Sequence, residues 1–543
     1  MCGIVGYAGN IETACGKPLE VCLQGLERLE YRGYDSAGVA LTAPGMDKVV
    51  VRKKAGRLKN LVEDIERKPM PLATVGIGHT RWATNGEPSD VNAHPHTSMD
   101  GKVAIIHNGI IENASQLRLD LQAEGYRFAS ATDTEVAAKL LGKIVDKIIA
   151  DEGKPDLFKA VRRMARMLEG AFTILATDCR QPDIVVGARH DSPLVVGLGE
   201  GENFLGSDVA AFVAYTKRAM EVDQDQAVCV SADKVIVTDF DGNVVENPKT
   251  YTVDWDASAA EKGGWDSFMD KEIHEDPAAV QRTLLGRFDA NGGITLDEVR
   301  IDEHDFKAID KIIVVACGTA SYAGQVAKYA IEHWVRIPVE IELAHEFRYR
   351  DPILTPRTLV VAISQSGETM DTLMALRHAR EQGSKVLAIC NTQGASIPRE
   401  SDAVLYTHAG PEVAVASTKA FVAQITAAYL LGLYLAQVKG AMFRDEIHQM
   451  LDSLKDMPRK IQWVLDTQPK TIQAAAERMV NANSFLFLGR HVGYPVALEG
   501  ALKLKEIAYT FTEGFAAGEL KHGPIALVDE GEPVVFIVPP QRG

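Results

Sequence analysis

The stretch MCGIVGYAGN (residues 1–10) sets the first expectation about the fold, because it places a cysteine directly before an apolar, glycine-punctuated strand. Aminopeptidases generally remove an initiator methionine that precedes a small residue, which leaves Cys2 with both a thiol and a free α-amine. These two groups can act as nucleophile and base on one residue. A cysteine at position two is more often incidental, so other residues have to support this interpretation.

The totals indicate a soluble, multidomain protein. With 543 residues, the chain is long enough for two to four domains, and its contents of 46% hydrophobic and 24% charged residues are ordinary for globular proteins. The formal net charge of −16 argues against a general nucleic-acid or anionic-membrane surface. We therefore expect small-molecule partners, and a local basic pocket for a phosphorylated metabolite remains compatible with this charge.

Cysteine and histidine spacing gives no sign of a metal or a disulfide. The seven cysteines include no CxxC pair, so we expect neither a disulfide framework nor a zinc site. The sequence also lacks the pattern of a signal peptide, and together these features favour a cytoplasmic location. The uncharged run 420–438 contains Gln, Thr and Tyr, which favour a buried or subunit-interface helix over a membrane span. The triplet HPH (94–96) invites a metal interpretation, but its proline favours turn structure.

The first half of the chain has the pattern of an α+β domain over 1–240. Short β-rich runs such as VAIIHN (103–108) alternate with helical stretches such as 133–149. A polar, turn-rich segment follows, and we take 241–285 as a linker.

The second half changes to an α/β pattern. KIIVVACGTA (311–320) and TLVVAISQSGET (358–369) are continuous β-branched runs that end in small, hydroxyl-rich turns and lead into helices. This order predicts βαβ units in a doubly wound parallel sheet. We assign this first domain of the second half to 286–455.

An internal repeat follows and predicts a second domain of the same kind over 456–543. The segment 484–504 repeats the strand, glycine turn and helix of 311–329, and PVVFIVPP (533–540) corresponds to the next strand. A copy that stops there has missing sheet neighbours. We therefore expect this domain to be incomplete and the natural protein to continue beyond Gly543.

Three motifs support a chemical role for Cys2: HTRWATNG (79–86), HNGIIEN (107–113) and TDTE (132–135). Taken singly, they read as a surface loop, a hairpin turn and a helix N-cap. Together with LEYRGYDSAG (29–38), they match the needs of side-chain amide hydrolysis. An Asn amide and a Gly N–H can stabilise an oxyanion, an arginine can bind a carboxylate, and an aspartate can bind an ammonium group.

These motifs resemble the N-terminal-nucleophile, class II glutamine amidotransferases over 2–240, and the resemblance implies an αββα sandwich. It implies that Cys2 is the nucleophile with its own α-amine as base, that Asn108 and Gly109 form the oxyanion hole, and that Arg81, Trp82, Thr84 and Asp133 bind glutamine. Arg32 lies in another motif of the family as an orienting residue. Asn85 stands where relatives often have histidine, which bears on one glutamine contact and not on the chemistry.

Hydroxyl-rich turns in the second half suggest a phosphate site. SQSGET (364–369) ends a strand and precedes a helix N-terminus, where unsatisfied N–H groups favour an anion. No Walker lysine or GxGxxG pattern follows, so a nucleotide is disfavoured. Such a turn alone is more often ordinary loop chemistry, but CGTAS (317–321) and VASTKA (415–420) add two matching turns.

Acid–base residues occur further along. EGALKLKEIAY (499–509) places Glu499, Lys503 and Glu506 on one helical face, for which a solvated ion-pair ladder is the simpler explanation. GELKHGP (518–524) then adds a histidine on a loop. A histidine suits the opening of a sugar ring, and a carboxylate suits proton transfer between adjacent carbons.

These motifs resemble the sugar isomerase (SIS) domains. The resemblance implies that Glu506 moves a proton between C1 and C2, that His522 assists ring opening, and that Lys503 supports the open-chain intermediate. It also implies a set of residues that hold the phosphate, namely Ser364, Gln365, Ser366 and Thr369, and a set that contacts the sugar, namely Thr319, Val415 and Ser417. Ala320 departs from the serine that is common in these domains. The family's C-terminal tail, with its Schiff-base lysine, has no counterpart in the sequence.

The two motif sets, in this order, resemble a family of enzymes that use glutamine to aminate and isomerise fructose 6-phosphate. The resemblance implies L-glutamine and D-fructose 6-phosphate as substrates, glutamate and glucosamine 6-phosphate as products, and ammonia channelled between domains. It also implies no metal or redox cofactor and a homodimer formed through the SIS domains. Without the C-terminal tail, we expect glutaminase chemistry to survive and synthesis to fail.

Two alternatives follow from the same motifs. Another class II amidotransferase would carry an acidic diphosphosugar motif or a pyrophosphate loop, and the sequence has neither. A sugar-phosphate sensor with the SIS fold would not need acid–base residues, so Glu506 and His522 argue against it.

Overall fold

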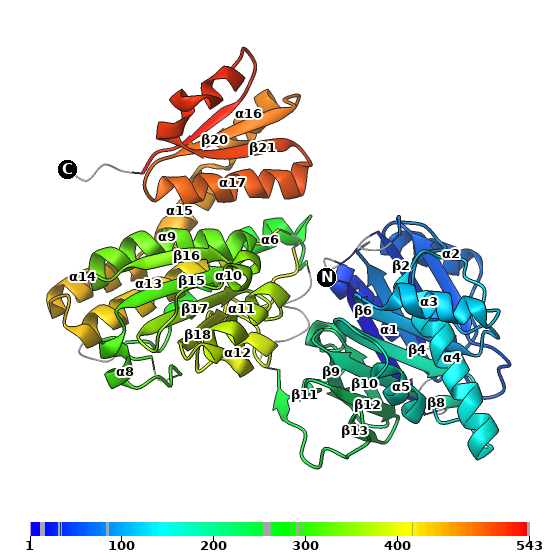
Figure 1. The fold of residues 1–543 in the computed structure, drawn as a ribbon. Helices are drawn as coiled ribbons and strands as arrows, with labels where there is room; N and C mark the ends of the chain where they lie inside the picture. The colour runs from blue at the N-terminus through cyan, green and yellow to red at the C-terminus, as the bar shows by residue number, and fades with distance from the viewer. Residues whose placement is uncertain are drawn as a thin grey trace. The chain divides into compact units, whose positions relative to one another are not determined.

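The chain forms two compact units, unit 1 (Met1–Glu261) and unit 2 (Lys262–Gly543), in the computed structural model (Figure 1). The boundary falls within the segment 241–285. The structure describes residues 2–10, 17–30, 33, 35–82, 86–253, 262–288, 293–296, 298–414 and 416–539. Four residues discussed above lie outside the described residues, namely Arg32, Thr84, Asn85 and Val415.

Unit 1 contains two antiparallel sheets. The first sheet has, in spatial order, β14 (Thr250–Thr252), β11 (Arg218–Glu221), β9 (Val195–Leu198), β10 (Glu202–Gly206), β1 (Gly3–Gly9), β4 (Val75–Arg81), β2 (Ser36–Thr42) and β3 (Val50–Ala55). The second sheet has β13 (Val235–Asp239), β12 (Gln226–Ser231), β8 (Gln181–His190), β7 (Phe172–Asp178), β6 (Val103–Gly109) and β5 (His96–Thr97). The strands predicted at 3–8 and 103–108 are β1 and β6.

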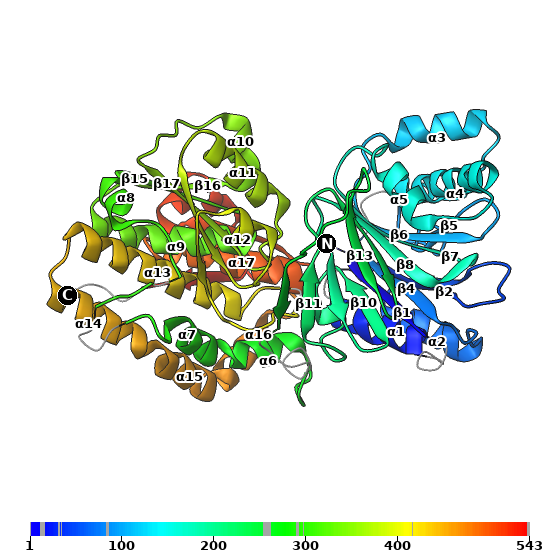
Figure 2. The ribbon, with the colours of Figure 1, turned by 90° about the horizontal axis from the view of Figure 1, so that it is seen from below.

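Helices cover the outer faces of both sheets. The first sheet carries α1 (Lys17–Leu29) and α2 (Leu58–Arg67), with the short 3-10 helix η2 (Val209–Ala211). The second sheet carries α3 (Ala114–Ala123), α4 (Asp133–Glu152) and α5 (Leu157–Ala165). Figure 2 shows the four layers in order, from α3–α5 through the two sheets to α1 and α2. The αββα sandwich expected from the sequence is confirmed.

The alternation of side chains along β1 explains how one strand contributes to two apolar cores, one between the sheets and one under α1. In β1, Ile4 and Ala8 pack between the sheets, whereas Val5 and Tyr7 pack against α1. Successive side chains of a strand point to opposite faces, and here both faces are buried, so the strand reads as an almost continuous apolar run.

Unit 2 begins with a parallel five-stranded sheet in the order β16 (Val339–Leu343), β15 (Lys311–Ala316), β17 (Thr358–Ser364), β18 (Lys385–Cys390) and β19 (Ala403–Tyr406). Side chains of Ile312 and Val314 face α9 and α13, whereas Ile313 and Val315 face α10, α11 and α12. Helices therefore cover both faces, and the predicted doubly wound sheet is confirmed. The helices of this region are α6 (Phe268–His274), α7 (Asp276–Leu284), α8 (Glu303–Ala308), α9 (Gly318–Val335), α10 (Ala344–Arg350), α11 (Met370–Glu381), α12 (Ser396–Glu400) and α13 (Lys419–Lys439).

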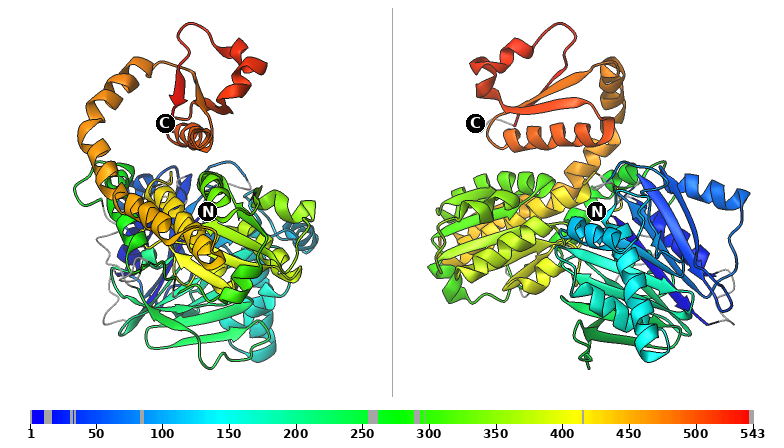
Figure 3. Two further views of the ribbon diagram at one scale, coloured as in Figure 1. Left: turned by 90° about the vertical axis from the view of Figure 1, so that its left-hand side faces the viewer. Right: turned by 45° about the vertical axis from the view of Figure 1, so that its right-hand side comes forward.

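The second copy repeats the start of this plan. Its sheet has the order β21 (Phe511–Ala516), β20 (Ser484–Gly489) and β22 (Val534–Ile537), all parallel, with α17 (Gly493–Ala508) on one face (Figure 3). The order β21-β20-β22 matches β16-β15-β17, which confirms the predicted repeat. The remaining elements are α14 (Arg444–Lys455), α15 (Met457–Thr467), α16 (Pro469–Met479), and the 3-10 helices η4 (Ala517–His522) and η5 (Pro524–Leu527).

Among the described helices, α13 alone is long and apolar enough to cross a membrane. Most of its residues are buried, and it packs against α9 and α7. The buried helix predicted at 420–438 is therefore confirmed, because the apolar surface of α13 belongs to the core of unit 2.

Candidate active sites

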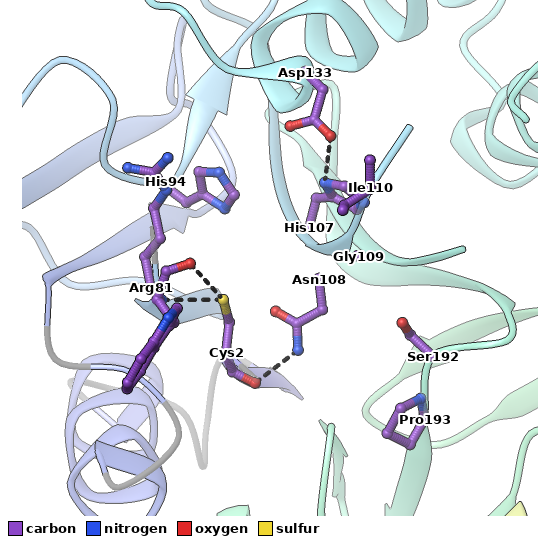
Figure 4. A pocket seen from close by; sticks show the side chains of 11 residues that line it. Cys2, Arg81, His94, His107, Asn108, Gly109, Ile110, Asp133, Ser192 and Pro193 are labelled. Atoms are coloured by element: carbon purple, nitrogen blue, oxygen red, sulfur yellow. Dashed lines mark hydrogen bonds and ion pairs between the residues drawn. The ribbon is translucent and has the colours of Figure 1, made fainter. Parts of the chain in front are cut away.

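Cys2 lies at the start of β1 and opens into a pocket of about 290 Å³ in unit 1. Figure 4 shows Cys2 between Arg81 and Asn108, with the segment of Ser192 and Pro193 on the far side of Asn108. The pocket is lined by Cys2, Arg81, Trp82, His94, His107, Asn108, Gly109, Ile110, Asp133, Ser192 and Pro193. Five sequence-predicted residues that lie up to 131 positions from Cys2 thus meet it in one cavity, namely Arg81, Trp82, Asn108, Gly109 and Asp133.

Alternation along β6 aims two neighbouring side chains in opposite directions. Ala104 and Ile106 pack between the sheets, so Asn108 also points toward the first sheet, where its Nδ2 donates to the Cys2 carbonyl oxygen at 2.8 Å. His107 points the other way and makes a hydrogen bond of 3.0 Å from Nδ1 to the Thr134 hydroxyl. The strand thus connects the nucleophile with the start of α4.

The Cys2 thiol is held by the backbone of Trp82. The Trp82 N–H donates to Cys2 Sγ at 3.2 Å, and Sγ lies 3.6 Å from the Trp82 carbonyl oxygen. Burial raises the pKa of the Cys2 thiol, and this effect exceeds the lowering by the Trp82 N–H and by the Arg81 charge. The thiol is therefore neutral at rest, and its attack on a carboxamide needs a base.

Gly109 gives the pocket a backbone shape that other residues do not adopt. Its φ is +116°, and a Cβ at this position would lie 2.0 Å from the Ala171 carbonyl oxygen. Only glycine fits this conformation without displacing β7. The predicted Asn-Gly hairpin alternative is wrong, because β6 pairs with β7 through Asn108 and Gly109 and the chain continues into Ile110.

Two charged side chains lie at the pocket wall. An Arg81 guanidinium nitrogen donates to the Gly86 carbonyl oxygen at 3.1 Å. The Asp133 carboxylate accepts the N–H groups of Ile111 and Thr134, each at 3.0 Å, which fixes it at the N-terminus of α4. The helix N-cap is Thr132, whose hydroxyl accepts the Glu135 N–H. Asp133 is therefore available to the pocket and is not the cap.

A group of buried histidines borders the pocket, and no catalytic or binding role was predicted for it. His79 and His94 have ring centroids 4.3 Å apart, and His94 and His96 have centroids 5.3 Å apart. Burial lowers the pKa of His79 to about 3 and lowers those of His94 and His96 well below the usual value. Both histidines of the HPH triplet are buried and contribute to this neutral cluster.

Three further pocket residues were not predicted: Ile110 lies inside the HNGIIEN motif, whereas Ser192 and Pro193 stand in no motif. Ile110, Ser192 and Pro193 line the cavity, and the Ser192 carbonyl oxygen accepts the Thr173 hydroxyl at 2.7 Å. The loop that follows β8 carries Ser192 and Pro193 to the site through the pairing of β8 with β7. His79 and His107, by contrast, could have been found, because each stands beside a predicted residue within its own motif.

In unit 2, the candidate sugar-phosphate residues lie at the crevice of the five-stranded sheet. The connection that leaves β15 runs to β16 on one side, and the connection that leaves β17 runs to β18 on the other side, so the strand order reverses between β15 and β17. Ligands bind at such switch points, outside the carboxyl ends of the strands. Thr319 in the first turn of α9 and Ser364 at the end of β17 border this crevice.

The turn after β17 is closed by its own hydroxyl groups. The Ser364 and Thr369 hydroxyls lie 3.0 Å apart, Ser364 Oγ accepts the Gly367 N–H at 3.0 Å, and Ser366 Oγ accepts the Glu368 N–H at 3.2 Å. These bonds agree with the ordinary-turn alternative and also shape the loop in front of α11. The helix follows at Met370 with no side-chain cap on its N-terminal amides.

Four polar side chains from α9 and α17 meet near the same crevice. Glu499 Oε1 accepts the Thr319 hydroxyl at 3.1 Å, while Lys503 Nζ donates to Thr319 Oγ1 at 3.0 Å and to Glu506 Oε2 at 2.7 Å. Burial raises the pKa of Glu499 to about 7, against the opposing effect of Lys503. The predicted common face of Glu499, Lys503 and Glu506 is confirmed. The ion pairs of the ladder are present, with Lys503 Nζ 3.4 Å from Glu499 and 2.7 Å from Glu506, but Glu499 is buried and not solvated.

Two predicted residues are held differently. The Ser417 hydroxyl donates to the buried Glu412 carboxylate at 2.9 Å, in the loop between β19 and α13. His522 is exposed at the end of η4, and no hydrogen bond between described residues joins it to Glu506. The structure thus brings Thr319, Lys503 and Glu506 together but does not bring His522 to them.

Comparison with known families agrees with the two units. The glutamine amidotransferase domain family matches residues 79–214, and the SIS domain family matches residues 306–434 and 478–543.

Relatives that carry a functional name match the whole chain. The glutamine–fructose-6-phosphate aminotransferase (isomerizing) of Corynebacterium efficiens is 63% identical, and that of Streptomyces coelicolor is 59% identical; each match covers 100% of this chain and 86% of the relative. Among solved structures, the C-terminal domain of glucosamine-fructose-6-phosphate aminotransferase from Francisella tularensis matches with a TM-score of 0.49 and 41% identity, over 51% of this chain and 77% of that one. Identity at this level over the full length leads to one conclusion: this chain belongs to the glutamine–fructose-6-phosphate aminotransferase (isomerizing) family.

Proposed function

We propose that unit 1 splits glutamine with Cys2 and that unit 2 uses the ammonia to convert fructose 6-phosphate into glucosamine 6-phosphate. The overall reaction is the one that names the family, and it consumes one glutamine and releases one glutamate. The observation that carries the residue roles is the convergence of Cys2, Asn108, Arg81 and Asp133 on a single pocket.

In the first step, Cys2 Sγ attacks the side-chain carbonyl carbon of glutamine. The base is the α-amino group that removal of Met1 leaves on Cys2, because its ordinary pKa of about 7.7–8.0 suits proton transfer near neutrality. The carbonyl oxygen becomes an oxyanion that the Asn108 side-chain amide and the Gly109 N–H stabilise. Ammonia leaves as the tetrahedral intermediate collapses to a thioester, and water then releases glutamate.

Glutamine is held by its α-carboxylate and its α-ammonium group. Arg81 binds the carboxylate, and Asp133 binds the ammonium group from the start of α4. Trp82 covers the bound substrate, which its position beside the thiol supports. Thr84, outside the described residues, completes this set as a proposal from the sequence.

In unit 2, ammonia adds to the C2 carbonyl of open-chain fructose 6-phosphate, and water leaves to give an imine. Glu506 takes a proton from C1 and returns it to C2, which forms the amino aldose. Lys503 bridges Glu506 and Thr319 and stabilises the developing charge on the sugar oxygens. We assign ring opening to His522, and its exposed position requires it to approach the crevice when sugar binds.

The phosphate group of the sugar binds in the turn after β17. Ser364, Gln365, Ser366 and Thr369 surround the N-terminal amides of α11, which favour an anion. The sugar chain then extends toward Thr319 on α9 and Ser417 before α13. Val415, outside the described residues, lies in the same loop sequence as Ser417.

The test is incubation of the protein with glutamine and fructose 6-phosphate, with both products measured. We expect the parent to release glutamate and, with a complete C-terminal tail restored, to form glucosamine 6-phosphate in an equal amount; a Cys2→Ala variant should form amino sugar only when ammonia is supplied. Release of glutamate without any amino sugar, even with a complete C-terminal tail restored, would contradict the sugar half of the proposal and would favour a sensor role for unit 2.

We further propose that the protein works in the cytoplasm as a homodimer formed through unit 2. Large apolar side chains are exposed on its second copy, with Tyr509 at 78%, Phe511 at 65% and Phe536 at 58% exposure. Exposed apolar surface of this kind favours association with a second chain. Light scattering distinguishes a dimer from a monomer of 59.0 kDa.

A further inference from the structure

His79 lies behind the pocket and outside its lining. It follows Ile77 on the same face of β4, so its side chain points between the two sheets of unit 1, where it is fully buried. Its Nε2 lies 3.0 Å from the His107 carbonyl oxygen and 3.0 Å from Asn108 Oδ1. The imidazole therefore crosses from the first sheet to the second at the residue that faces Cys2.

The partners of His79 decide its tautomer. A backbone carbonyl oxygen only accepts hydrogen bonds, so Nε2 carries the proton and donates it to the His107 and Asn108 oxygens. Nδ1 is then unprotonated, and among the described residues it has no hydrogen-bond partner. Burial lowers the pKa of His79 to about 3, which keeps the ring neutral and in this single tautomer near neutral pH.

The hydrogen bond from His79 Nε2 to Asn108 Oδ1 fixes the orientation of the Asn108 side-chain amide. Asn108 Nδ2 donates to the Cys2 carbonyl oxygen at 2.8 Å, while Oδ1 accepts from His79. A flipped amide would place Nδ2 against the His79 N–H and Oδ1 against the Cys2 carbonyl oxygen, and both bonds would be lost. A neutral Nε2–H histidine is thus matched to one amide orientation and excludes the other.

We propose that His79 is a positioning residue for glutamine hydrolysis, because it locks the Asn108 amide with its N–H₂ end toward Cys2 and the oxyanion. The inference rests on the role of Asn108 in the proposed function. His79 is not a general base, because its Nε2 proton is engaged with two acceptors and its ring does not line the pocket.

Two amide variants test the bond itself. In His79→Gln, the side-chain nitrogen can reach the place of the imidazole Nε2, whereas in His79→Asn it corresponds to Nδ1 and falls short. For His79→Asn, we expect kcat for glutamate release to fall about 100-fold with the glutamine KM within about 2-fold, as for loss of an oxyanion donor. We expect His79→Gln to recover activity to within about 10-fold of the parent.

A thiol probe separates this effect from damage to the nucleophile or the fold. Alkylation of Cys2 by iodoacetamide needs no oxyanion hole, and mass spectrometry of the N-terminal peptide measures its rate. We expect the parent rate in both His79 variants. Slowed alkylation in both variants, or equal activity of the Gln and Asn variants, would overturn the proposal.

A double-mutant cycle separates this inference from the function on which it rests. Asn108→Ala alone should lower kcat, and adding His79→Asn should cause no further loss, because both changes remove the same device. Additive losses would show that His79 acts elsewhere. An unchanged kcat in Asn108→Ala would instead refute the proposed oxyanion hole, whatever the result for His79.

Discussion

At the scale of single residues, Gly109 is the position where backbone and chemistry depend on each other most directly. Its φ is positive while β6 remains paired with β7 through this residue. A side chain there would meet the Ala171 carbonyl oxygen. The proposed oxyanion site would therefore depend on the backbone path as well as on the Asn108 amide.

We predict that Gly109→Ala lowers kcat for glutamate release by about 100-fold or more, because displacement of the N–H removes one oxyanion donor. Steady-state kinetics with glutamine measure the effect. Gly125→Ala is the matched control, since Gly125 also has a positive φ, +93°, but has open space around its absent side chain. Equal losses in the two variants would mean that strain, and not the oxyanion site, sets the effect.

Sequence reasoning could find the residues that carry chemistry but not those that only give shape. Cys2, Arg81 and Asn108 were predictable because each reactive type stands in a motif with its neighbours. Ser192 and Pro193 were not, because they reach the pocket through strand pairing that no local pattern records.

At the scale of elements, the loop between β19 and α13 is held by buried carboxylates. Glu272 in α6 accepts the Val413 N–H at 2.6 Å and the Ala414 N–H at 3.0 Å. Glu412 accepts the Ser417 hydroxyl and the Thr418 N–H at 2.9 and 2.8 Å. The loop that carries Ser417 thus takes its shape from two acids within the core.

Proximity of these acids makes the stability of unit 2 depend on pH. Burial, together with the Glu412 charge, raises the pKa of Glu272 to about 7, and the same two causes raise that of Asp276 to about 7. A raised folded-state pKa means that the folded protein binds more protons than the unfolded chain between about pH 4.5 and 7. The stability is present below that range and is lost as the pH rises through 7.

We predict that Glu272→Gln makes unit 2 more stable at pH 8 relative to the parent, by on the order of 2 kcal/mol, because Gln keeps an acceptor oxygen without a titrating charge. Urea unfolding at pH 5.5 and pH 8 measures the difference. Glu303→Gln, an exposed acid of α8 that pairs with Lys307, is the control and should change stability by less than about 0.5 kcal/mol. A Glu272→Gln variant that loses stability equally at both pH values would contradict the charge argument.

The elements that the sequence missed are edge strands. The central strands β15 and β17 were predictable from continuous β-branched runs with both faces buried. Strand β16 alternates apolar with polar residues (VEIEL), strand β21 has Thr, Glu and Gly in its middle (FTEGFA), and both strands lie at the edges of their sheets. These segments form strands because they pair with β15 and β20, and no local run of apolar residues predicts them.

At the scale of the whole molecule, the two units have separate cores. The apolar clusters of unit 1 consist of residues up to and including Val253, and those of unit 2 consist of residues from Ala279 onward. Each unit therefore buries its own apolar surface and has the means to fold by itself.

We predict that residues 1–261 alone fold and release glutamate from glutamine, with kcat within about 10-fold of the full chain. All pocket residues and all hydrogen bonds described around Cys2 lie inside this range. Glutamate release and the unfolding transition of the fragment measure the outcome. A fragment that folds with the transition of unit 1 but lacks activity would show that unit 2 completes the glutamine site.

The same separation predicts that the two units respond to acid in opposite directions. In unit 1, burial lowers the folded-state pKa of four histidines below the usual value, namely His79, His94, His96 and His107. As the pH falls through 6.5, the unfolded chain therefore binds protons that the folded unit does not bind, and the folded unit loses stability. Each histidine that stays neutral in the folded unit lowers the free energy of unfolding by about 2 kcal/mol at pH 5. Unit 2 gains stability over the same range through its raised carboxyl pKa values.

Calorimetry between pH 8 and pH 5 should therefore show one transition falling and the other rising in temperature, with the fragment 1–261 identifying the falling one. Two transitions that shift together would show that the histidines of unit 1 are protonated in the folded state or that the units unfold as one.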